Sequence, residues 1–419
     1  MSSLPKLRLS EFSDSDTYFP HKFDDIFSFS SGKNIKQNES SPEFSTPCVR
    51  YGELYHMYGE VIIRTINNTN LEHSELTFSA GNEILLPSAG EDPLDIGSAS
   101  ALTLEGVAIG RTINVLRPKG TIDYSHIYVS YYINEKLRKR ISQLARGASI
   151  SNVYNSDLKT LKACLPSFPE QQKVASFLSK VDEKITLLTE KKGKLTEYKK
   201  GVMQQLFNGK WQEQDGQLTF IPPTLRFKAD DGSEFPDWEE KKLSNFLKES
   251  RIKGDSGDKA KKLTVKLWGN GVHEKNEVRD GSVNTQYYVR KAGQLIYSKL
   301  DFLNCAFGIV PEYLCGYQST LDLPCLDIDT TIVHPYFLLE RVKQKSFYKK
   351  FGDTADGSRK AKRIHVDVFT GFLMPLPSLE EQEKITNFLL SLDQKIDLAN
   401  SELEKAKEWK KGLLQQMFV

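Results

Sequence analysis

The stretch Leu165–Phe207 reads LPSFPEQQKVASFLSKVDEKITLLTEKKGKLTEYKKGVMQQLF, and the chain contains it a second time. The second copy, Leu376–Phe418, reads LPSLEEQEKITNFLLSLDQKIDLANSELEKAKEWKKGLLQQMF. The copies align without a gap, and 20 of the 43 paired positions are identical. A unit repeated at such a distance indicates a molecule built from two similar halves.

Both copies carry apolar side chains at alternating steps of four and three residues, and Pro166 and Pro169 precede the first series. A proline is tolerated at the start of a helix, and a 3.5-residue period is typical of a coiled coil. Lysines such as Lys199 and Lys410 interrupt the apolar series. We expect two long helices that pair through a seam, which consists of Val174, Leu178, Val181, Ile185, Leu188, Leu195, Ile385, Leu389, Leu392, Ile396, Leu403 and Leu413.

Two seams in one chain should bury each other, because the linkage keeps their effective concentration high. Either orientation is possible, and we expect the antiparallel one, which relates the halves by an approximate two-fold axis. The predicted fold is α+β or α/β: two globular domains separated by a long antiparallel two-helix coiled coil, with an internal pseudo-two-fold repeat. The predicted segments are residues 1–165, 166–210, 211–375 and 376–419.

The duplication extends beyond the helices. Each half has a short lead-in, a glycine followed by a short apolar strand, and a histidine-led segment that precedes a charged helical stretch. The residues between these segments differ, as expected for a protein that reads two different targets with one geometry, although drift after duplication leaves the same pattern. The paired segments are Pro5–Leu9 and Pro223–Phe227, Gly81–Ser88 and Gly293–Ser298, and His126–Tyr132 and His334–Leu339.

A second apolar stripe lies beside the seam at matching positions in both copies. Exposed aromatic residues often mark interfaces, so the stripe is a candidate docking site for other subunits. Packing against the neighbouring globular domain is the alternative. The stripe consists of Phe177, Leu187, Tyr198, Phe388, Leu398 and Trp409.

The motif content favours a protein that has no catalytic residues and no metal site. The 419 residues contain five cysteines without a C-x-x-C pair, seven scattered histidines and no nucleotide-binding motif. The N-terminal sequence lacks a secretion signal and no apolar run could span a membrane, so we expect reduced cysteines in a cytoplasmic protein. Asp182–Lys184 and Asp393–Lys395 have a carboxylate-x-lysine spacing, but on long helices we expect them to be solvated charges.

Basic residues are grouped with small polar ones. The serine hydroxyl and the backbone N–H of glycine can donate hydrogen bonds to phosphates, and arginine can recognise guanine through two hydrogen bonds. The segment SRKAKR, Ser358–Arg363, holds four cations, and a solvated charged loop is the alternative interpretation. The candidates for contact with DNA are Lys33, Ser88, Arg111, Arg146, Ser149, Ser298, Lys299, Ser358, Arg359, Lys360, Lys362 and Arg363.

These features resemble the specificity subunit of type I restriction–modification systems. The resemblance covers essentially the whole chain and is carried by the LP-x-x-x-EQ-x-K openings, Leu165–Lys173 and Leu376–Lys384, that precede the long helices. The glycine-led strands and a Gly-Ser turn before the last strand of each half add to it. The first-half turn, Gly147-Ala148-Ser149, departs from the pattern and puts its basic partners in doubt.

The resemblance implies two target-recognition domains, each reading one half of a split, asymmetric site in double-stranded DNA, with the helices as the spacer. It implies two methyltransferase subunits docked on the helices and two motor–endonuclease subunits in the full complex. S-adenosylmethionine, ATP and magnesium would bind these partners, and this chain would carry no cofactor. The implied location is the prokaryotic cytoplasm. The alternatives are a specificity subunit of a different restriction architecture, a coiled-coil scaffold that does not bind DNA, and a nuclease.

Overall fold

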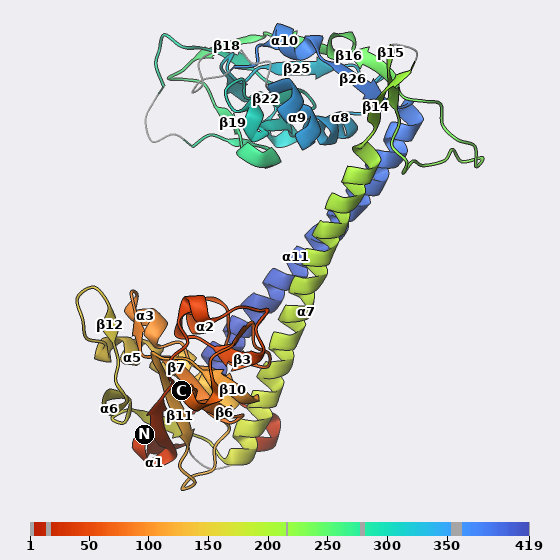
Figure 1. Ribbon diagram of the computed structural model, residues 1–419. Helices are drawn as coiled ribbons and strands as arrows, with labels where there is room; N and C mark the ends of the chain where they lie inside the picture. The colour runs from red at the N-terminus through yellow and green to blue at the C-terminus, as the bar shows by residue number, and fades with distance from the viewer. Residues whose placement is uncertain (1–3, 14–17, 215–216, 277–280, 353–362, 419) are drawn as a thin grey trace. The chain divides into compact units, whose positions relative to one another are not determined.

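The computed structural model describes residues 4–13, 18–214, 217–276, 281–352 and 363–418 (Figure 1). The chain forms two compact units. Unit 1 consists of Met1–Lys191 and Ala399–Val419, and unit 2 consists of Lys192–Leu398. The helices α7 (Phe168–Phe207) and α11 (Leu379–Met417) are the two long helices predicted, and each contributes a segment to both units. Among the described residues, none of the helices is long and apolar enough to cross a membrane.

Unit 1 contains a five-stranded sheet of order β2-β11-β7-β9-β4. Its strands are β2 (Phe27–Ser31), β11 (Ile113–Pro118), β7 (Glu83–Pro87), β9 (Ser100–Leu102) and β4 (Val61–Ile62). The central strand β7 is buried at every residue and follows Gly81, whose φ of 81° is readily adopted only by glycine. The glycine-led strand is therefore confirmed. A second sheet contains β5 (Asn67–Thr69), β3 (Thr46–Val49), β10 (Glu105–Ile109) and β6 (Phe78–Ala80).

The core of unit 1 contains parts that are far apart in the sequence. Helix α4 (His126–Tyr132) continues through a π-helical turn into α5 (Arg138–Leu144), which confirms the predicted helical stretch. Tyr128 of α4 is fully buried, and its ring centroid lies 5.1 Å from that of Phe418 at the end of α11. Tyr128 and Phe418 accordingly belong to one core cluster of this unit.

Unit 2 repeats this plan with a four-stranded sheet of order β17-β25-β22-β23. Strand β22 follows Gly293, which also has a φ of 81°. Phe207 at the end of α7 packs against Phe337 of α8, with 5.5 Å between ring centroids, as Phe418 packs on Tyr128 in unit 1. The elements are β17 (Leu247–Ser250), β25 (Cys325–Ile328), β22 (Leu295–Tyr297), β23 (Phe307–Ile309), α8 (Pro335–Val342) and α9 (Lys345–Gly352).

Smaller elements complete both units. In each unit a short antiparallel pair precedes the long helix: β1 (Phe19–Lys22) with β13 (Lys162–Leu165), and β16 (Glu239–Lys242) with β26 (Leu373–Leu376). Unit 2 also has a three-stranded sheet and two hairpins. Their strands are β18 (Lys253–Ser256), β21 (Gln286–Val289), β24 (Gln318–Ser319), β19 (Leu263–Val265), β20 (Val272–Glu274), β14 (Lys210–Gln214) and β15 (Gln217–Ile221).

The repeated LP-x-x-x-EQ opening makes the same buried ion pair in both units. The Glu170 side chain, only 1% exposed, accepts two hydrogen bonds of 2.7 Å from Nε and Nη2 of Arg8. The Glu381 side chain, fully buried, accepts bonds of 2.9 and 2.7 Å from Nε and Nη2 of Arg226. Each arginine belongs to the repeated lead-in, so this contact explains why the lead-in is duplicated together with the helix.

The next residue in each copy is a glutamine, and its side chain forms a hydrogen bond that links the helix to its own globular domain. Gln171 Oε1 accepts from the backbone N–H of Ser125, immediately before α4, at 3.1 Å. Gln382 Oε1 accepts from the backbone N–H of His334, immediately before α8, at 2.9 Å. The start of each long helix is therefore fixed to the body that precedes it in the sequence.

The long helices are antiparallel within each unit. In unit 1, Val174 and Leu178 near the start of α7 share a core cluster with Leu413 and Met417 near the end of α11. In unit 2 the ends are exchanged, and Val202 and Leu206 cluster with Ile385 and Leu389. This arrangement confirms the antiparallel prediction. All of the predicted seam residues are buried or half-buried.

We predict that Arg8→Met destabilises the protein by on the order of 3 kcal/mol, because it leaves the carboxylate of Glu170 buried without its cation. Arg226→Met should have a similar effect through Glu381. Lys6→Met, which removes an exposed cation of the same lead-in, is the control and should leave the free energy of unfolding unchanged. Urea denaturation of the purified chain measures all three, and an Arg8→Met chain as stable as the control would contradict the prediction.

Two half-buried histidines occupy matching positions at the starts of α4 and α8. Burial lowers the pKa of His126 and also that of His334. His126 Nε2 has no hydrogen-bond partner among the described residues, whereas His334 Nδ1 accepts from the backbone N–H of Tyr336 at 3.2 Å. Both rings are therefore held in the neutral form.

The sign of the pH dependence follows from these lowered pKa values. As the pH falls below the ordinary histidine value of about 6.5, the unfolded chain binds protons before the folded chain does, so stability is lost. We predict that, when the pH is lowered from about 7.5 to about 5.5, the melting temperature of the double variant His126→Gln, His334→Gln falls less than that of wild type. His56→Gln, at an exposed position, should behave as wild type. Equal losses in double variant and wild type would contradict the prediction.

Candidate nucleic-acid interface

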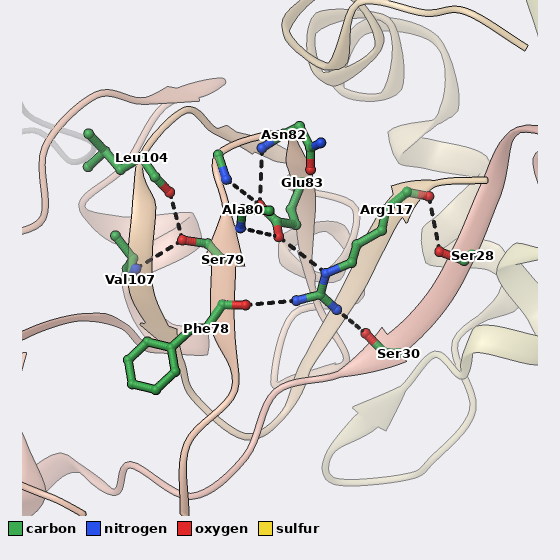
Figure 2. Close-up of polar contacts among 11 residues, drawn as sticks. Ser28, Ser30, Phe78, Ser79, Ala80, Asn82, Glu83, Leu104, Val107 and Arg117 are labelled. Atoms are coloured by element: carbon green, nitrogen blue, oxygen red, sulfur yellow. Dashed lines mark hydrogen bonds and ion pairs between the residues drawn. The ribbon is translucent and has the colours of Figure 1, made fainter. Parts of the chain in front are cut away.

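A buried carboxylate organises the turn that leads into β7 (Figure 2). Glu83 accepts hydrogen bonds from the backbone N–H groups of Ala80, Gly81 and Asn82, at 2.7, 3.1 and 3.1 Å. Arg117 on the neighbouring strand β11 donates its Nε to the same carboxylate at 3.2 Å. Its remaining nitrogens bond to Ser30 Oγ and to the Phe78 carbonyl. Arg117, which belongs to a basic group in the sequence, therefore stabilises the sheet.

Unit 2 builds the same turn with the polar roles exchanged. Gln294 Oε1 accepts from the backbone N–H of Lys291 at 2.9 Å, the counterpart of the bond from Ala80 to Glu83. Gln294 Nε2 then donates to Asp327 on β25 at 2.7 Å. In unit 1 the carboxylate, Glu83, belongs to the glycine-led strand and accepts from Arg117 on the neighbouring strand. In unit 2 the carboxylate, Asp327, belongs to the neighbouring strand and accepts from Gln294 beside the glycine.

In unit 1 the candidate DNA contacts converge on one end of the five-stranded sheet. Lys33 follows the end of β2, Arg111 precedes the start of β11, and Ser88 follows the end of β7. Backbone bonds join these segments: Lys33 N–H to the Ile109 carbonyl at 3.0 Å, Arg111 N–H to the Asn34 carbonyl at 2.9 Å, and Ser88 N–H to the Thr112 carbonyl at 2.8 Å. Lys33 and Arg111 are exposed, and Ser88 is half-buried.

The loops that carry Lys33 and Arg111 have an unusual backbone. Asn34, Ile35 and Thr112 have φ values of 48°, 55° and 66°, in a region that non-glycine residues rarely occupy. A side chain at Gly32 would place its Cβ 2.1 Å from the Gly110 carbonyl oxygen, so the loops approach closely at this point. Strained backbone of this kind is concentrated at functional sites.

The turn with Arg146 and Ser149 joins the same end of the sheet. Strand β12 (Ser151–Asn152) pairs with β8 (Ala89–Gly90), which directly follows Ser88. Gly147 has a φ of 136°, and a Cβ there would lie 2.0 Å from the Ile150 carbonyl oxygen, so the turn requires glycine. The Arg146 side chain is 74% exposed and bonds to Asp157 at 2.9 Å. Ser149 is exposed.

In unit 2 the described candidates lie at the corresponding end of the sheet. Lys299 follows β22, and its carbonyl accepts from Ile364 N–H at 3.1 Å, which brings Arg363 to the same place. Ser298 is an exception because its side chain is 5% exposed and its hydroxyl bonds to Asp301 at 3.1 Å. The Ser298 hydroxyl thus holds a turn and is not presented to solvent. Ser358, Arg359, Lys360 and Lys362 lie outside the described residues.

A pocket of about 420 Å³ at this end of unit 2 contains basic residues that the sequence analysis missed. Its lining includes Lys248, Arg251 and His365 together with the predicted Lys299, and also the acidic Glu249, which pairs with Arg251 at 2.7 Å, and Asp367. Arg251 is 63% exposed and immediately follows β17, close to the place that Lys33 has after β2. The repeat could have identified Arg251, because β17 and β2 occupy the same position in the two sheet orders.

The stripe beside the seam divides into two groups. Leu187, Tyr198, Leu398 and Trp409 are 58, 54, 59 and 48% exposed, in agreement with a docking surface. The other two, Phe177 and Phe388, are half-buried and pack on the globular bodies, Phe388 with its ring 5.6 Å from Phe227.

Asp182 and Asp393 are not solvated charges, contrary to expectation. Asp182 bonds to Lys410 at 2.7 Å, and Asp393 to Lys199 at 2.5 Å. Both lysines are 16% exposed, since they occupy seam positions. Spacing along one helix cannot identify such pairs, because the partner comes from the other helix.

The comparisons with known proteins agree with this geometry. Residues 17–197 match the family model of the type I restriction modification DNA specificity domain. A Methanocaldococcus jannaschii protein named "Putative type I restriction enzyme MjaX specificity subunit" is 26% identical over 74% of this chain and 71% of its own length. The type I restriction enzyme MjaVIII specificity subunit of the same organism is 24% identical over 81% and 78%.

The fold is also similar to a solved structure. The crystal structure of the type I restriction-modification S subunit from M. genitalium matches with a TM-score of 0.61 at 15% identity, over 100% of this chain and 99% of that one. This likeness concerns the fold alone. Over most of its length the chain is therefore similar to type I restriction enzyme specificity subunits, and residues 17–197 resemble their DNA specificity domain.

Proposed function

We propose that this protein is the subunit of a type I restriction–modification complex that binds a specific DNA sequence. Each unit reads one half of a bipartite, asymmetric site in double-stranded DNA, and the paired helices set the spacer between the half-sites. The observation that carries the proposal is the gathering of basic residues at the matching sheet end of both units, all exposed except the half-buried Lys299: Lys33, Arg111 and Arg146 in unit 1, and Arg251, Lys299 and Arg363 in unit 2.

The two ends use the same backbone frame but different side chains. Cations on loops can neutralise phosphates, and arginines among them can make paired hydrogen bonds to guanine. Because the frame is shared, both units can approach DNA in the same manner. Because the side chains differ, the half-sites they read should differ, which makes the whole site asymmetric.

The helix length supports a spacer role. Helix α7 has 40 residues, which corresponds to a length on the order of 60 Å. Two half-sites one helical turn of DNA apart are separated by about 34 Å. A helix pair of this length is sufficient to connect two readers at such half-sites.

The subunit is non-catalytic, and methylation and cleavage belong to its partners. We propose two methyltransferase subunits, docked on the helices, and two motor–endonuclease subunits, all in the prokaryotic cytoplasm. S-adenosylmethionine, ATP and magnesium bind to those partners. A shallow groove of about 410 Å³ beside Trp409, lined by Leu188, Glu402, Lys405 and Ala406, supports docking on the helix pair.

Inserting one heptad into both α7 and α11 tests the function. Seven residues add about 10.5 Å, so the spacer of the recognised site should lengthen by about three base pairs while both half-sites stay the same. Methylome sequencing of cells that carry the complete system, with the unmodified chain as control, measures both quantities. Altered half-sites would exclude the spacer role. Absence of any bipartite motif with the unmodified chain would favour a scaffold that does not bind DNA.

The docking surface predicts a second outcome. Tyr198→Ala together with Trp409→Ala should reduce assembly with the methyltransferase subunit by at least tenfold in affinity, about 1.4 kcal/mol, because two exposed aromatic anchors are lost. Because the Trp409 ring lies 6.0 Å from that of Phe177, the melting temperature of the isolated chain should fall slightly, by less than the loss of assembly. Lys200→Ala with Lys411→Ala removes exposed neighbours and serves as the control. A drop in melting temperature as large as the loss of assembly would identify both aromatics as structural residues.

A further inference from the structure

We propose that two half-buried ion pairs, Lys410–Asp182 and Lys199–Asp393, lock the register of the helix pair, so that these four residues determine the spacing. The register itself is independent of function, whereas its effect on DNA spacing rests on the proposed function.

In unit 1 the lock joins both helices and the globular body. Lys410 Nζ on α11 lies 2.7 Å from Asp182 Oδ1 on α7 and 2.8 Å from Glu60 Oε2 of the body. The Tyr131 hydroxyl of α4 donates to the other oxygen of Asp182 at 2.5 Å. Burial alone would lower the pKa of Lys410, but Glu60 and Asp182 raise it above its ordinary value, so the ammonium stays charged.

Unit 2 contains the same arrangement with the helices exchanged. Lys199 Nζ on α7 lies 2.5 Å from Asp393 Oδ1 on α11, and the hydroxyl of Tyr336 of α8 donates to the other oxygen of Asp393. Lys199 follows Asp182 on α7 by the same number of residues as Lys410 follows Asp393 on α11. One antiparallel register therefore satisfies both pairs.

The apolar seam alone specifies this register poorly. Its positions repeat every heptad, so a slide of seven residues again places apolar side chains opposite each other. The same slide moves each lysine by about 10.5 Å, out of reach of its aspartate. In one direction Asp182 would face Met417 and Asp393 would face Leu206. A half-buried charge that loses its partner against an apolar side chain is unfavourable, so the ion pairs disfavour the slide.

A slide of seven residues in the opposite direction has different consequences for the two ion pairs. Asp182 would face Leu403, but Asp393 would face Lys192 and gain an alternative cation. In this slid register Asp182 therefore has no replacement cation, whereas Asp393 has one, so only the Lys410–Asp182 pair opposes the slide. We infer that loss of Lys410 allows the slide toward Lys192 in preference to the opposite one.

Cysteine pairs can report the register in the full chain. Lys191 and Glu402 form an ion pair of 3.6 Å between α7 and α11. The pair joins the ends of long side chains, so the Cα atoms need not lie within the roughly 7 Å that a disulfide spans, and a short bismaleimide is used to bridge Lys191→Cys with Glu402→Cys as the report of the native register. Lys191→Cys with Lys395→Cys reports the slide toward Lys192, and Lys191→Cys with Trp409→Cys reports the opposite slide. All four positions are exposed, and Cys315→Ala removes the exposed native thiol from the background.

With the lock intact, only the native pair of cysteines should be bridged by the bismaleimide. Lys410→Met should raise the yield of the Lys191→Cys, Lys395→Cys pair at least fivefold, and the exposed control Lys411→Met should not. Asp182→Leu with Lys410→Leu removes both charges of the pair. Because it also takes away the partners of Glu60 and of the Tyr131 hydroxyl, Glu60→Gln and Tyr131→Phe are added both to it and to its control, and folding is checked by melting temperature. This double variant should populate the slid register. Cross-linking in the native register alone for a folded double variant would overturn the lock.

Methylome sequencing with the same double variant separates the lock from the proposed function. A broadened spacer at unchanged half-sites supports both. A slid register by cross-linking with one unchanged spacer would leave the lock standing and overturn the spacer role of the helices. A native register by cross-linking overturns the lock whatever spacer is found.

Discussion

Glu170 and Glu381 sit in the first turns of α7 and α11 with almost no access to water, and the rest of the architecture depends on how they are neutralised. A helix N-terminus favours an anion, but a buried carboxylate also needs a cation with matching geometry. The two-pronged guanidinium of an arginine supplies it from the lead-in of the same half. This ion pair attaches the start of each long helix to its own globular domain independently of the contacts along the seam.

The far ends of the helices are attached differently. Phe418 and Phe207 insert aromatic rings into cores formed by α4 and α8, and Arg341 donates to the Phe207 carbonyl at 2.8 Å at the end of α7. Charged contacts therefore hold the beginnings of the helices, and aromatic packing holds their ends, joined at α7 by the hydrogen bond from Arg341. Each unit contains one attachment of each kind, so the two halves of the repeat hold the helix pair in the same way.

Much of this could be predicted from the sequence because it depends on periodicity and repetition. The 3.5-residue seam, the antiparallel pairing and the glycine-led strands before Ser88 and Ser298 follow from patterns within one segment or between two copies. The roles of Ser298 and Asp182 were misjudged, and that of Arg117 was not foreseen, for one shared reason. Their roles depend on partners brought close only by tertiary structure, and residue type cannot distinguish an arginine that stabilises a sheet from one that faces solvent.

The division of the chain also has a consequence for folding order. Unit 2 is one continuous segment, Lys192–Leu398, whereas the core of unit 1 needs Phe418, which lies far along the chain from Tyr128. During synthesis unit 2 can complete its core while the aromatic pocket of unit 1 still lacks its last ring. Contacts between such distant residues form slowly because the intervening loop must close first. The half that is made first is therefore the half that finishes folding last.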